Sequence, residues 1–232
     1  MHTEIVKLQE NSYPIFIGEG LANSPDLVAD YIIGNDVLIV TNEVVAPLYL
    51  EKITKLFDNK NCLSYVLPDG EEQKKLKTVH KIIDFLLGAG FGRDSTLVSL
   101  GGGVVGDITG FTASVFMRGV NVIQIPTTLL AQVDASVGGK TGVNHALGKN
   151  LIGSFYQPKC VVCDSQFLRS LTQKEYLSGL SEVIKYGLIK DAGFFEWLED
   201  HVNEIIALEP ETIHQMIQQS CKIKAAIVSQ DE

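Results

Sequence analysis

A run of three glycines ends an apolar stretch and is followed by Gly106 and Asp107. Gly101, Gly103 and Gly106 form a G-x-G-x-x-G pattern between a predicted strand and a predicted helix. Bare backbone at such a turn lets a pyrophosphate approach the amides of a helix N-terminus. Successive glycines raise the entropic cost of folding, so the pattern favours a phosphate or dinucleotide site over a tight turn alone. Asp107 either interacts with the positive helix end or bonds a nucleotide ribose or amide.

A second polar segment, residues 125–155, is rich in glycine, lysine and amide side chains; its candidates are Asp134, Lys140, Asn144, Lys149 and Asn150. Lysines beside glycines suit the binding of phosphate or carboxylate groups. The alternative is a polar surface loop. The "GGKT" within this segment is not a P-loop, because Asp134 stands where that motif requires glycine.

Composition limits the function further. The chain has 232 residues, of which 45% are apolar and 20% charged, as in one large or two ordinary globular domains. A net charge of −9 argues against general nucleic-acid binding and against an anionic membrane surface. Neither a signal peptide nor a membrane-length apolar run is apparent, so we expect a cytoplasmic protein. The cysteines, Cys62, Cys160, Cys163 and Cys221, are expected to be buried and reduced.

The candidate residues must be positioned by strands that alternate with helices. Apolar runs predict strands at 3–8, 13–18, 36–42, 62–67, 96–100 and 121–126, with the first two as a hairpin. Helices are expected at 24–33 (with Ser24 as N-cap), 43–57, 71–87 and 103–118. This alternation predicts an α/β fold with a doubly wound, mostly parallel sheet.

From Thr172 onward the pattern becomes helical, with segments at 172–190, 194–206 and 211–230. We therefore expect an NAD-binding α/β domain at 1–167 and the first part of a helical metal and substrate domain at 168–232. The chain stops directly after a helical pattern, which predicts that this helical domain is incomplete.

Several motifs occur together: "PDGEEQK", "GGGVVGD", "FMRG", "IPTTLLAQVDASVGGKTGVN", "GKNLIG" and "GLSEVIKYGLI". Their combination closely resembles the 3-dehydroquinate synthase family of sugar-phosphate cyclases. More distant similarity extends to glycerol dehydrogenases and iron-dependent alcohol dehydrogenases. The resemblance implies a homodimer that binds NAD and a divalent metal, usually zinc with cobalt possible. It also implies conversion of 3-deoxy-arabino-heptulosonate 7-phosphate, a phosphorylated sugar acid, to 3-dehydroquinate in the shikimate pathway.

The resemblance also implies which residues contact NAD: Asn42, Glu71, Lys74, Gly102, Gly103, Val104, Asp107, Thr127, Thr128, Lys149, Phe167, Leu171 and Glu175. Local structure offers alternatives for some of them. Glu71 and Lys74 have the spacing of a surface ion pair at a helix start. The two threonines are possible helix caps, and Thr172 with Glu175 forms a predicted capping box.

For the metal, the resemblance implies Glu182, with Lys185 one turn further as a substrate contact; the spacing alone favours a salt bridge between them. Asp134, Lys140, Asn150 and Lys224 match further substrate contacts. Arg118 matches an arginine that reaches the substrate phosphate across a dimer interface.

The implied reaction begins with oxidation of a substrate hydroxyl by hydride transfer to NAD. Phosphate then leaves by elimination, the hydride returns, the ring opens and an aldol step closes the carbocycle. Metal stabilises alkoxide and enolate charge. The substrate's own phosphate takes the proton, so the protein mainly positions groups and stabilises charge.

One feature departs from the family pattern. The two metal-binding histidines of the family lie downstream of the final "DE", and none of His2, His80, His145, His201 and His214 has their context. We therefore expect the isolated chain to be inactive. Alternatives are a sister cyclase of the inosose or valiolone synthase type, a metal-dependent polyol dehydrogenase, or an NAD-binding module without turnover. The lysine-rich segment argues against the polyol dehydrogenase.

Overall fold

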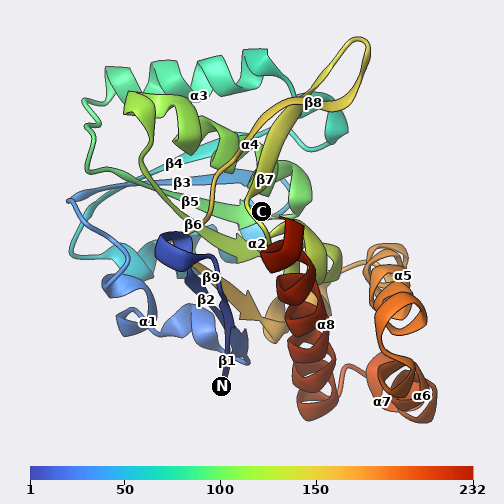
Figure 1. The fold of residues 1–232 in the computed structure, drawn as a ribbon. Coiled ribbons are helices and arrows are strands. Elements are labelled where there is room, and N and C mark those ends of the chain that lie inside the picture. Colours follow the sequence, from blue (N-terminus) through green and yellow to red (C-terminus); the bar gives the residue numbers. More distant parts are fainter. Residues whose placement is uncertain (232) are drawn as a thin grey trace.

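The computed structural model describes residues 1–231 and contains a seven-stranded sheet (Figure 1). Its strands lie in the order β1 (His2–Val6), β2 (Tyr13–Gly18), β9 (Cys160–Asp164), β6 (Asn121–Pro126), β5 (Thr96–Gly101), β3 (Asp36–Asn42) and β4 (Asn61–Leu67). β1 runs antiparallel to β2, and all other pairings are parallel. The predicted hairpin and the predicted doubly wound, mostly parallel sheet are both confirmed.

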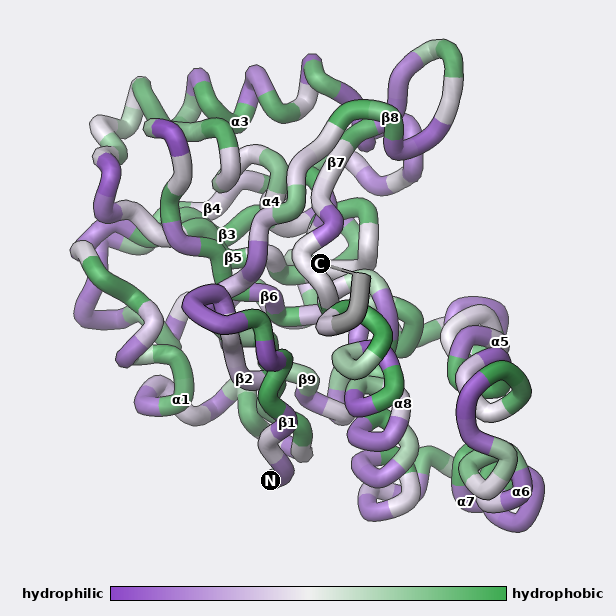
Figure 2. Tube along the Cα trace, viewed as in Figure 1, coloured by the Kyte–Doolittle hydropathy of each residue, from purple (hydrophilic) through white to green (hydrophobic). Residues whose placement is uncertain are grey.

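Helices cover both faces of this sheet, which explains the continuous apolar runs of its central strands. On one face, Ile39, Val98 and Ile123 pack with α1 (Asp26–Ala29) and α2 (Ala46–Thr54). On the other face, residues such as Leu38 and Leu97 pack with α3 (Leu76–Gly88) and α4 (Gly103–Val115). Figure 2 shows the hydrophobic segments of the sheet lying between these two helical layers.

Four helices follow the sheet: α5 (Gln173–Lys190), α6 (Ala192–Asp200), α7 (Val202–Ile206) and α8 (Pro210–Asp231). α8 packs against β1 and β2, and α5 packs against α6 (Figure 1). A third core joins Tyr13 and Ile15 to Val183, Tyr186 and Met216. The helix predicted at 194–206 is divided at His201, which has a non-helical backbone. None of the described helices has the length and apolar character needed to cross a membrane.

A second, two-stranded sheet is formed by β7 (Lys140–His145) and β8 (Gly148–Phe155). The alternative of a surface loop for this segment was wrong, because it folds into an antiparallel hairpin that packs on α4. Gly110 makes this close packing possible. A Cβ atom at Gly110 would lie 2.4 Å from Cγ2 of Thr141 on β7.

Several predicted helix ends were wrong. Residues 71–73 form a 3-10 turn, and α3 begins only at Leu76, since Lys75 has an extended backbone. The helix expected at 24–33 is the single turn α1, whose N-cap is Pro25 without a side-chain hydrogen bond. The helix expected at 43–57 is α2 followed by a 3-10 turn, Lys55–Phe57. The four cysteines are free, and all except Cys62 are buried, as expected.

Candidate functional site

The carboxyl ends of β3 and β5 lie next to each other at the point where the order of strands reverses. From β3 the chain moves outward to β4, whereas β5, β6 and β9 follow on the other side of β3. In open α/β sheets, ligands bind in the crevice outside the strand ends at such a reversal. β3 ends at Asn42 and β5 at Gly101, so two of the predicted NAD segments flank this crevice. The glycine motif therefore follows β5, the fifth strand along the chain, because the carboxyl end of β5 borders this crevice.

The glycine turn leaves the N-terminus of α4 uncovered. Gly102 is the N-cap of α4 and makes no side-chain cap hydrogen bond, and Gly103 begins the helix. A Cβ at Gly102 would lie 3.2 Å from Cγ2 of Thr128, and one at Gly103 would lie 3.3 Å from Cβ of Ala135. The missing side chains thus serve close packing as well as ligand access. The amides of the first turn remain available to an anion such as pyrophosphate.

Lys74 and Asp107 form an ion pair at the same end of the sheet. The Lys74 side chain is 8% exposed and that of Asp107 is 20% exposed. Burial raises the pKa of the Asp107 carboxyl, and the hydrogen bond and charge of Lys74 partly offset this rise. Lys74 therefore pairs with Asp107, not with Glu71 as its sequence spacing suggested. The reason is that α3 starts too late for Glu71 and Lys74 to share a helical face.

Glu71 instead contacts the β7–β8 hairpin. Its Oε1 accepts a hydrogen bond from Asn144 Nδ2 at 2.9 Å and lies 3.6 Å from Lys149 Nζ. The backbone N–H of Asn150 donates to Asn144 Oδ1 at 2.9 Å, and the Asn144 N–H donates to the Lys74 carbonyl at 2.7 Å. These bonds hold the hairpin against the segment that precedes the N-terminus of α3, and they bring Lys149 and Asn150 near the crevice.

The two threonines after β6 differ in their contacts. The Thr128 hydroxyl accepts a hydrogen bond from the Ala131 N–H at 3.2 Å, so it acts as a local cap. The Thr127 hydroxyl is buried and has no partner among the described residues. A buried hydroxyl without a partner is unfavourable unless a ligand or water bonds it. Thr127 therefore fits a ligand contact, and the prediction of a cap was wrong for this residue.

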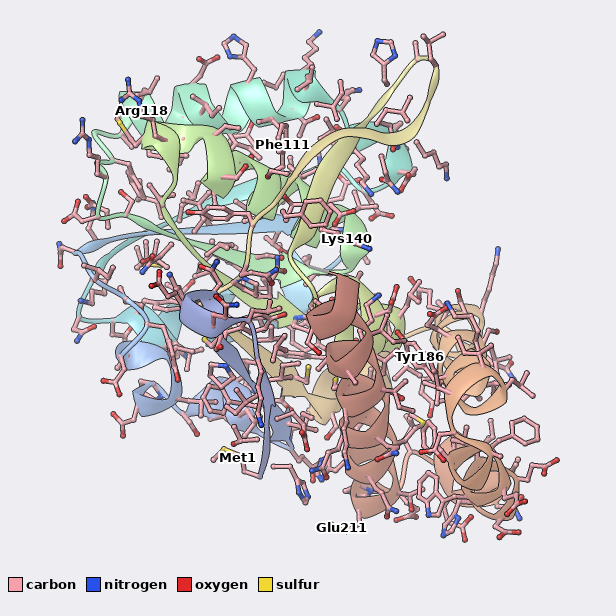
Figure 3. All side chains as sticks on the ribbon, viewed as in Figure 1. Met1, Phe111, Arg118, Lys140, Tyr186 and Glu211 are labelled. Carbon is pink, nitrogen blue, oxygen red and sulfur yellow. The ribbon has the colours of Figure 1, made fainter. Side chains whose placement is uncertain are left out.

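A cavity of about 500 Å³ adjoins the crevice and opens between α4, the hairpin and α8. Its lining includes five of the residues singled out from the sequence: Asp107, Asp134, Lys140, Asn150 and Lys224. Lys224 Nζ lies 2.5 Å from Asp134 Oδ1, which also accepts a hydrogen bond from Tyr186 Oη at 2.9 Å. Figure 3 shows Lys140 at the base of the hairpin and Tyr186 between α5 and α8. A larger cavity of about 620 Å³ between β1, α6 and α8 contains none of the predicted site residues.

Other predicted residues lie outside this cavity. Arg118 is exposed in a 3-10 turn after α4, well away from Lys140 (Figure 3). Glu182 and Lys185 form the i,i+3 ion pair that their spacing suggested, with Lys185 52% exposed. Glu175 accepts hydrogen bonds from Thr172 N and Oγ1, so the predicted capping box is confirmed.

Three predicted NAD contacts have their side chains engaged in the protein. Phe167 is fully buried against Tyr49, and Leu171 packs on the core, so each offers a ligand mainly its backbone. Asn42 Nδ2 donates to Asp69 Oδ1 at 2.6 Å, and its Oδ1 accepts from the Val45 N–H at 2.9 Å.

Sequence reasoning missed the hairpin residues of the cavity wall and Tyr186. The local signal for the hairpin is weak, because residues 140–145 contain one large apolar residue, Val143, and residues 146–147 are not a typical turn dipeptide. Tyr186 follows Lys185 directly, but nothing local indicates that its hydroxyl meets Asp134, which comes from another element.

The crevice fits NAD, because it combines a bare helix N-terminus with the unpartnered Thr127 hydroxyl. A metal site is not supported in the same way. The described part of the chain contains no group of three or more His, Cys, Asp or Glu side chains that could hold a metal ion. Glu182 alone does not make a site, since protein zinc sites use three or four protein ligands.

The fold and the crevice define a class of α/β proteins related to nucleotide-dependent sugar-phosphate cyclases. The solved structure of a 2-deoxy-scyllo-inosose synthase, complexed with carbaglucose-6-phosphate, NAD+ and Co2+, is similar with a TM-score of 0.92 and 25% identity. The similar region covers 99% of this chain and 63% of the inosose synthase chain. ValA, a 2-epi-5-epi-valiolone synthase from Streptomyces hygroscopicus subsp. jinggangensis with NAD+ and Zn2+ bound, has a TM-score of 0.82 and 29% identity over 94% of this chain and 61% of its own.

The chain belongs to the 3-dehydroquinate synthase family. The family model "3-dehydroquinate synthase N-terminal" matches residues 64–178, and "3-dehydroquinate synthase C-terminal" matches residues 179–232. A 3-dehydroquinate synthase from Nitrosococcus oceani is 53% identical over 232 residues, which is all of this chain and 65% of that protein. One from Acidithiobacillus ferrooxidans is 55% identical over 234 residues and is covered over 64% of its length. The chain therefore spans about two thirds of the length of these relatives.

Proposed function

We propose that the protein is a 3-dehydroquinate synthase, which converts 3-deoxy-arabino-heptulosonate 7-phosphate to 3-dehydroquinate and phosphate. The observation that carries this proposal is the convergence of Asp134, Lys140, Asn150 and Lys224 on one cavity beside the glycine turn. This cavity combines cationic and amide groups for an anionic sugar with a carboxylate for its hydroxyls. The identity of over 50% to synthases of this name supports the same activity.

NAD is the first proposed cofactor. The amides of Gly103 and Val104 would receive its pyrophosphate, and Thr127 and Asp107 lie close enough to the crevice to bond its sugar or amide groups. When bound, NAD would supply reversible hydride transfer at one substrate carbon. The Lys74–Asp107 pair holds the Asp107 carboxylate in place at this end of the crevice.

The chain's own residues would then bind and orient the substrate. Lys140 and Lys224 provide positive charge for its phosphate and carboxylate groups, and Asn150 provides an amide. Asp134 would accept a hydrogen bond from a hydroxyl. The substrate's own phosphate would take the proton during elimination, so these residues contribute positioning and charge stabilisation more than proton transfer.

A divalent metal, zinc or cobalt, is the second proposed cofactor, and Glu182 would be one of its ligands. The described residues supply no complete ligand set around Glu182. Support for the metal comes from the two sister cyclases, whose structures contain Co2+ and Zn2+. Lys185, one turn from Glu182, would face the substrate once its ion pair with Glu182 opens.

We further propose that the protein works in the cytoplasm as a homodimer, with Arg118 reaching the partner's substrate phosphate. Free, mostly buried cysteines suit a reducing compartment. Arg118 is exposed and lies away from the cavity of its own chain, as expected of a residue that serves a neighbour. The net charge of −9 supports neither a nucleic-acid nor an anionic membrane partner.

Phosphate release tests the proposed reaction. The protein expressed from the complete reading frame would be assayed with NAD and Zn2+ on the heptulosonate 7-phosphate, glucose 6-phosphate and sedoheptulose 7-phosphate. Release from the first substrate alone supports the synthase, and release from another moves the assignment to a sister cyclase. Lys140→Ala should abolish release, while the surface control Lys159→Ala should retain it.

NAD binding by the 232-residue chain, measured calorimetrically, tests the cofactor separately. If the chain binds NAD but the protein from the complete reading frame releases no phosphate from any of the three substrates, the result would favour an NAD-binding module without turnover over an enzyme. The higher identity to the synthases than to the solved inosose and valiolone synthases favours the 3-dehydroquinate assignment over the sister cyclases.

A further inference from the structure

Asp134 belongs to a π-helical turn, Ala131–Ala135, between β6 and the hairpin. The Ser136 N–H donates to the Ala131 carbonyl five residues earlier, at 3.1 Å, and the Val137 N–H donates to the Asp134 carbonyl at 3.0 Å. Neither of these amides bonds the carbonyls of Gln132 or Val133. Single π-helical turns are rare and occur frequently at functional sites. The two carbonyls therefore need donors from outside the turn.

Side chains from three different elements supply those donors. Cys221 Sγ on α8 lies 3.3 Å from the Gln132 oxygen, and Cys163 Sγ on β9 lies 3.7 Å from the same oxygen. Tyr186 Oη on α5 lies 3.3 Å from the Val133 oxygen. Both thiols are fully buried, and Tyr186 is 2% exposed. Burial raises the pKa of Tyr186 and of Cys163, so both stay protonated as donors at neutral pH.

The Tyr186 hydroxyl shares its single proton between the Asp134 side chain and the Val133 carbonyl of the turn. Its distance to Asp134 Oδ1 is 2.9 Å, shorter than its distance to the Val133 carbonyl. Lys224 Nζ bonds the same Oδ1 at 2.5 Å. Within the described part of the chain, Oδ2 accepts no hydrogen bond, and Asp134 lines the cavity. One carboxylate oxygen is thus held by the protein while the other is left for a ligand.

We propose that Tyr186 is a positioning residue for Asp134, acting with Cys163 and Cys221 to hold the π-helical turn so that Oδ2 of Asp134 faces the cavity. The proposal rests on the proposed function only where it calls Asp134 a substrate contact. Lys224 by itself cannot fix the carboxylate, because a lysine ammonium on a flexible stem restrains direction poorly. The rigid phenol ring, buried between α5 and α8, supplies the directional restraint.

The test compares Tyr186→Phe with Tyr176→Phe in the 232-residue chain. Tyr176 is a matched control on the same helix: it is also buried, and its hydroxyl donates to the Ile205 carbonyl at 2.8 Å, away from the turn. Two readouts are the carbon-13 resonance of the Asp134 carboxyl and the hydrogen exchange of the Ser136 and Val137 amides. Neither needs NAD, metal or turnover, so a failed phosphate-release assay leaves this test intact.

Tyr186→Phe should shift the Asp134 carboxyl resonance and speed exchange at Ser136 and Val137 about tenfold, as expected when a local unit loses one buried hydrogen bond. Tyr176→Phe should leave both readouts unchanged. Cys221→Ala, which removes a donor from Gln132 without touching Asp134, should speed the same two amides, and Cys221→Ser should restore slow exchange. Unchanged readouts in Tyr186→Phe, or equal changes in both tyrosine variants, would overturn the proposal.

Discussion

Lys74 and Asp107 form a largely buried ion pair that joins the segment after β4 to the first turns of α4. The pair lies at the strand ends where NAD is proposed to bind. Its charge state therefore affects both the stability of the fold and the shape of the crevice.

Lys74→Met should destabilise the protein by about 3 kcal/mol at neutral pH, because it leaves the Asp107 carboxylate buried without its partner. Burial already raises the folded-state pKa of Asp107 above its unfolded value. The stability contributed by this group is therefore fully present below an unfolded pKa of about 3.9 and is lost as pH rises through the folded pKa. Loss of Lys74 raises the folded pKa further, so the deficit should grow from acid toward neutral pH.

Urea unfolding of wild type and Lys74→Met at several pH values measures this effect. The double variant Lys74→Met, Asp107→Asn is the control, since it has no carboxylate at position 107 and its deficit relative to wild type should not grow from acid toward neutral pH. A Lys74→Met deficit that stays constant with pH would contradict the ion-pair explanation.

Thr127→Val should weaken NAD binding about tenfold while leaving the stability of the free chain equal or higher. Its hydroxyl is buried without a partner, so removing it costs the free chain no hydrogen bond but deprives a ligand of one. Thr96→Val is the matched control. The Thr96 hydroxyl is also buried without a partner among the described residues, but Thr96 begins β5, whereas the crevice lies at the other end of that strand, beyond Gly101. Calorimetric titration with NAD and thermal unfolding give the two readouts. Equal effects of both variants on NAD affinity would remove Thr127 from the site.

Gly110→Ala should destabilise the protein by about 2 kcal/mol, although alanine favours helices more than glycine does. The added Cβ would lie 2.4 Å from Thr141 Cγ2, which would push the hairpin away from α4. Gly88→Ala at the end of α3 is the control, because nothing lies within 4 Å of its Cβ position. Denaturant unfolding should show a loss for the first variant and none for the second. A stabilised Gly110→Ala protein would show that the hairpin is not packed as described.

Asp164→Ala should lower the free energy of unfolding by about 3 kcal/mol. The fully buried carboxylate accepts hydrogen bonds from the N–H groups of Gly20, Ala22 and Gln166 at 2.9–3.0 Å. Asp191→Ala removes the helix-capping bond from the Phe194 N–H and one bond from Gln219 Nε2, at a partly buried position, and should lower the free energy of unfolding by about 1 kcal/mol. Chemical unfolding of the two variants compares these losses. Similar values would mean that the three bonds of Asp164 do not act together.

Much of the local structure could be predicted from the sequence. The run at 36–42 has the apolar continuity of a strand covered on both faces, and β3 has those bounds. The capping box of Thr172 and Glu175 follows from four consecutive residues. Such features depend on neighbours in the chain, whose spacing the sequence states directly. Helix starts were less predictable, since the extended backbone at Lys75 is set by its bridge to Asn144 in the hairpin.

The sequence by itself determined the alternation of strands and helices, the bare glycine turn and the presence of lysines suited to an anionic ligand. Only the tertiary structure decided which residues meet. The strand order places Asn42 and Gly101 at one crevice, the late start of α3 pairs Lys74 with Asp107, and the packing of α5 and α8 brings Tyr186 and Lys224 to the same oxygen of Asp134. The physical reason is that these contacts join segments far apart in the chain. They arise from burial of apolar faces on both sides of one sheet, which local spacing does not encode.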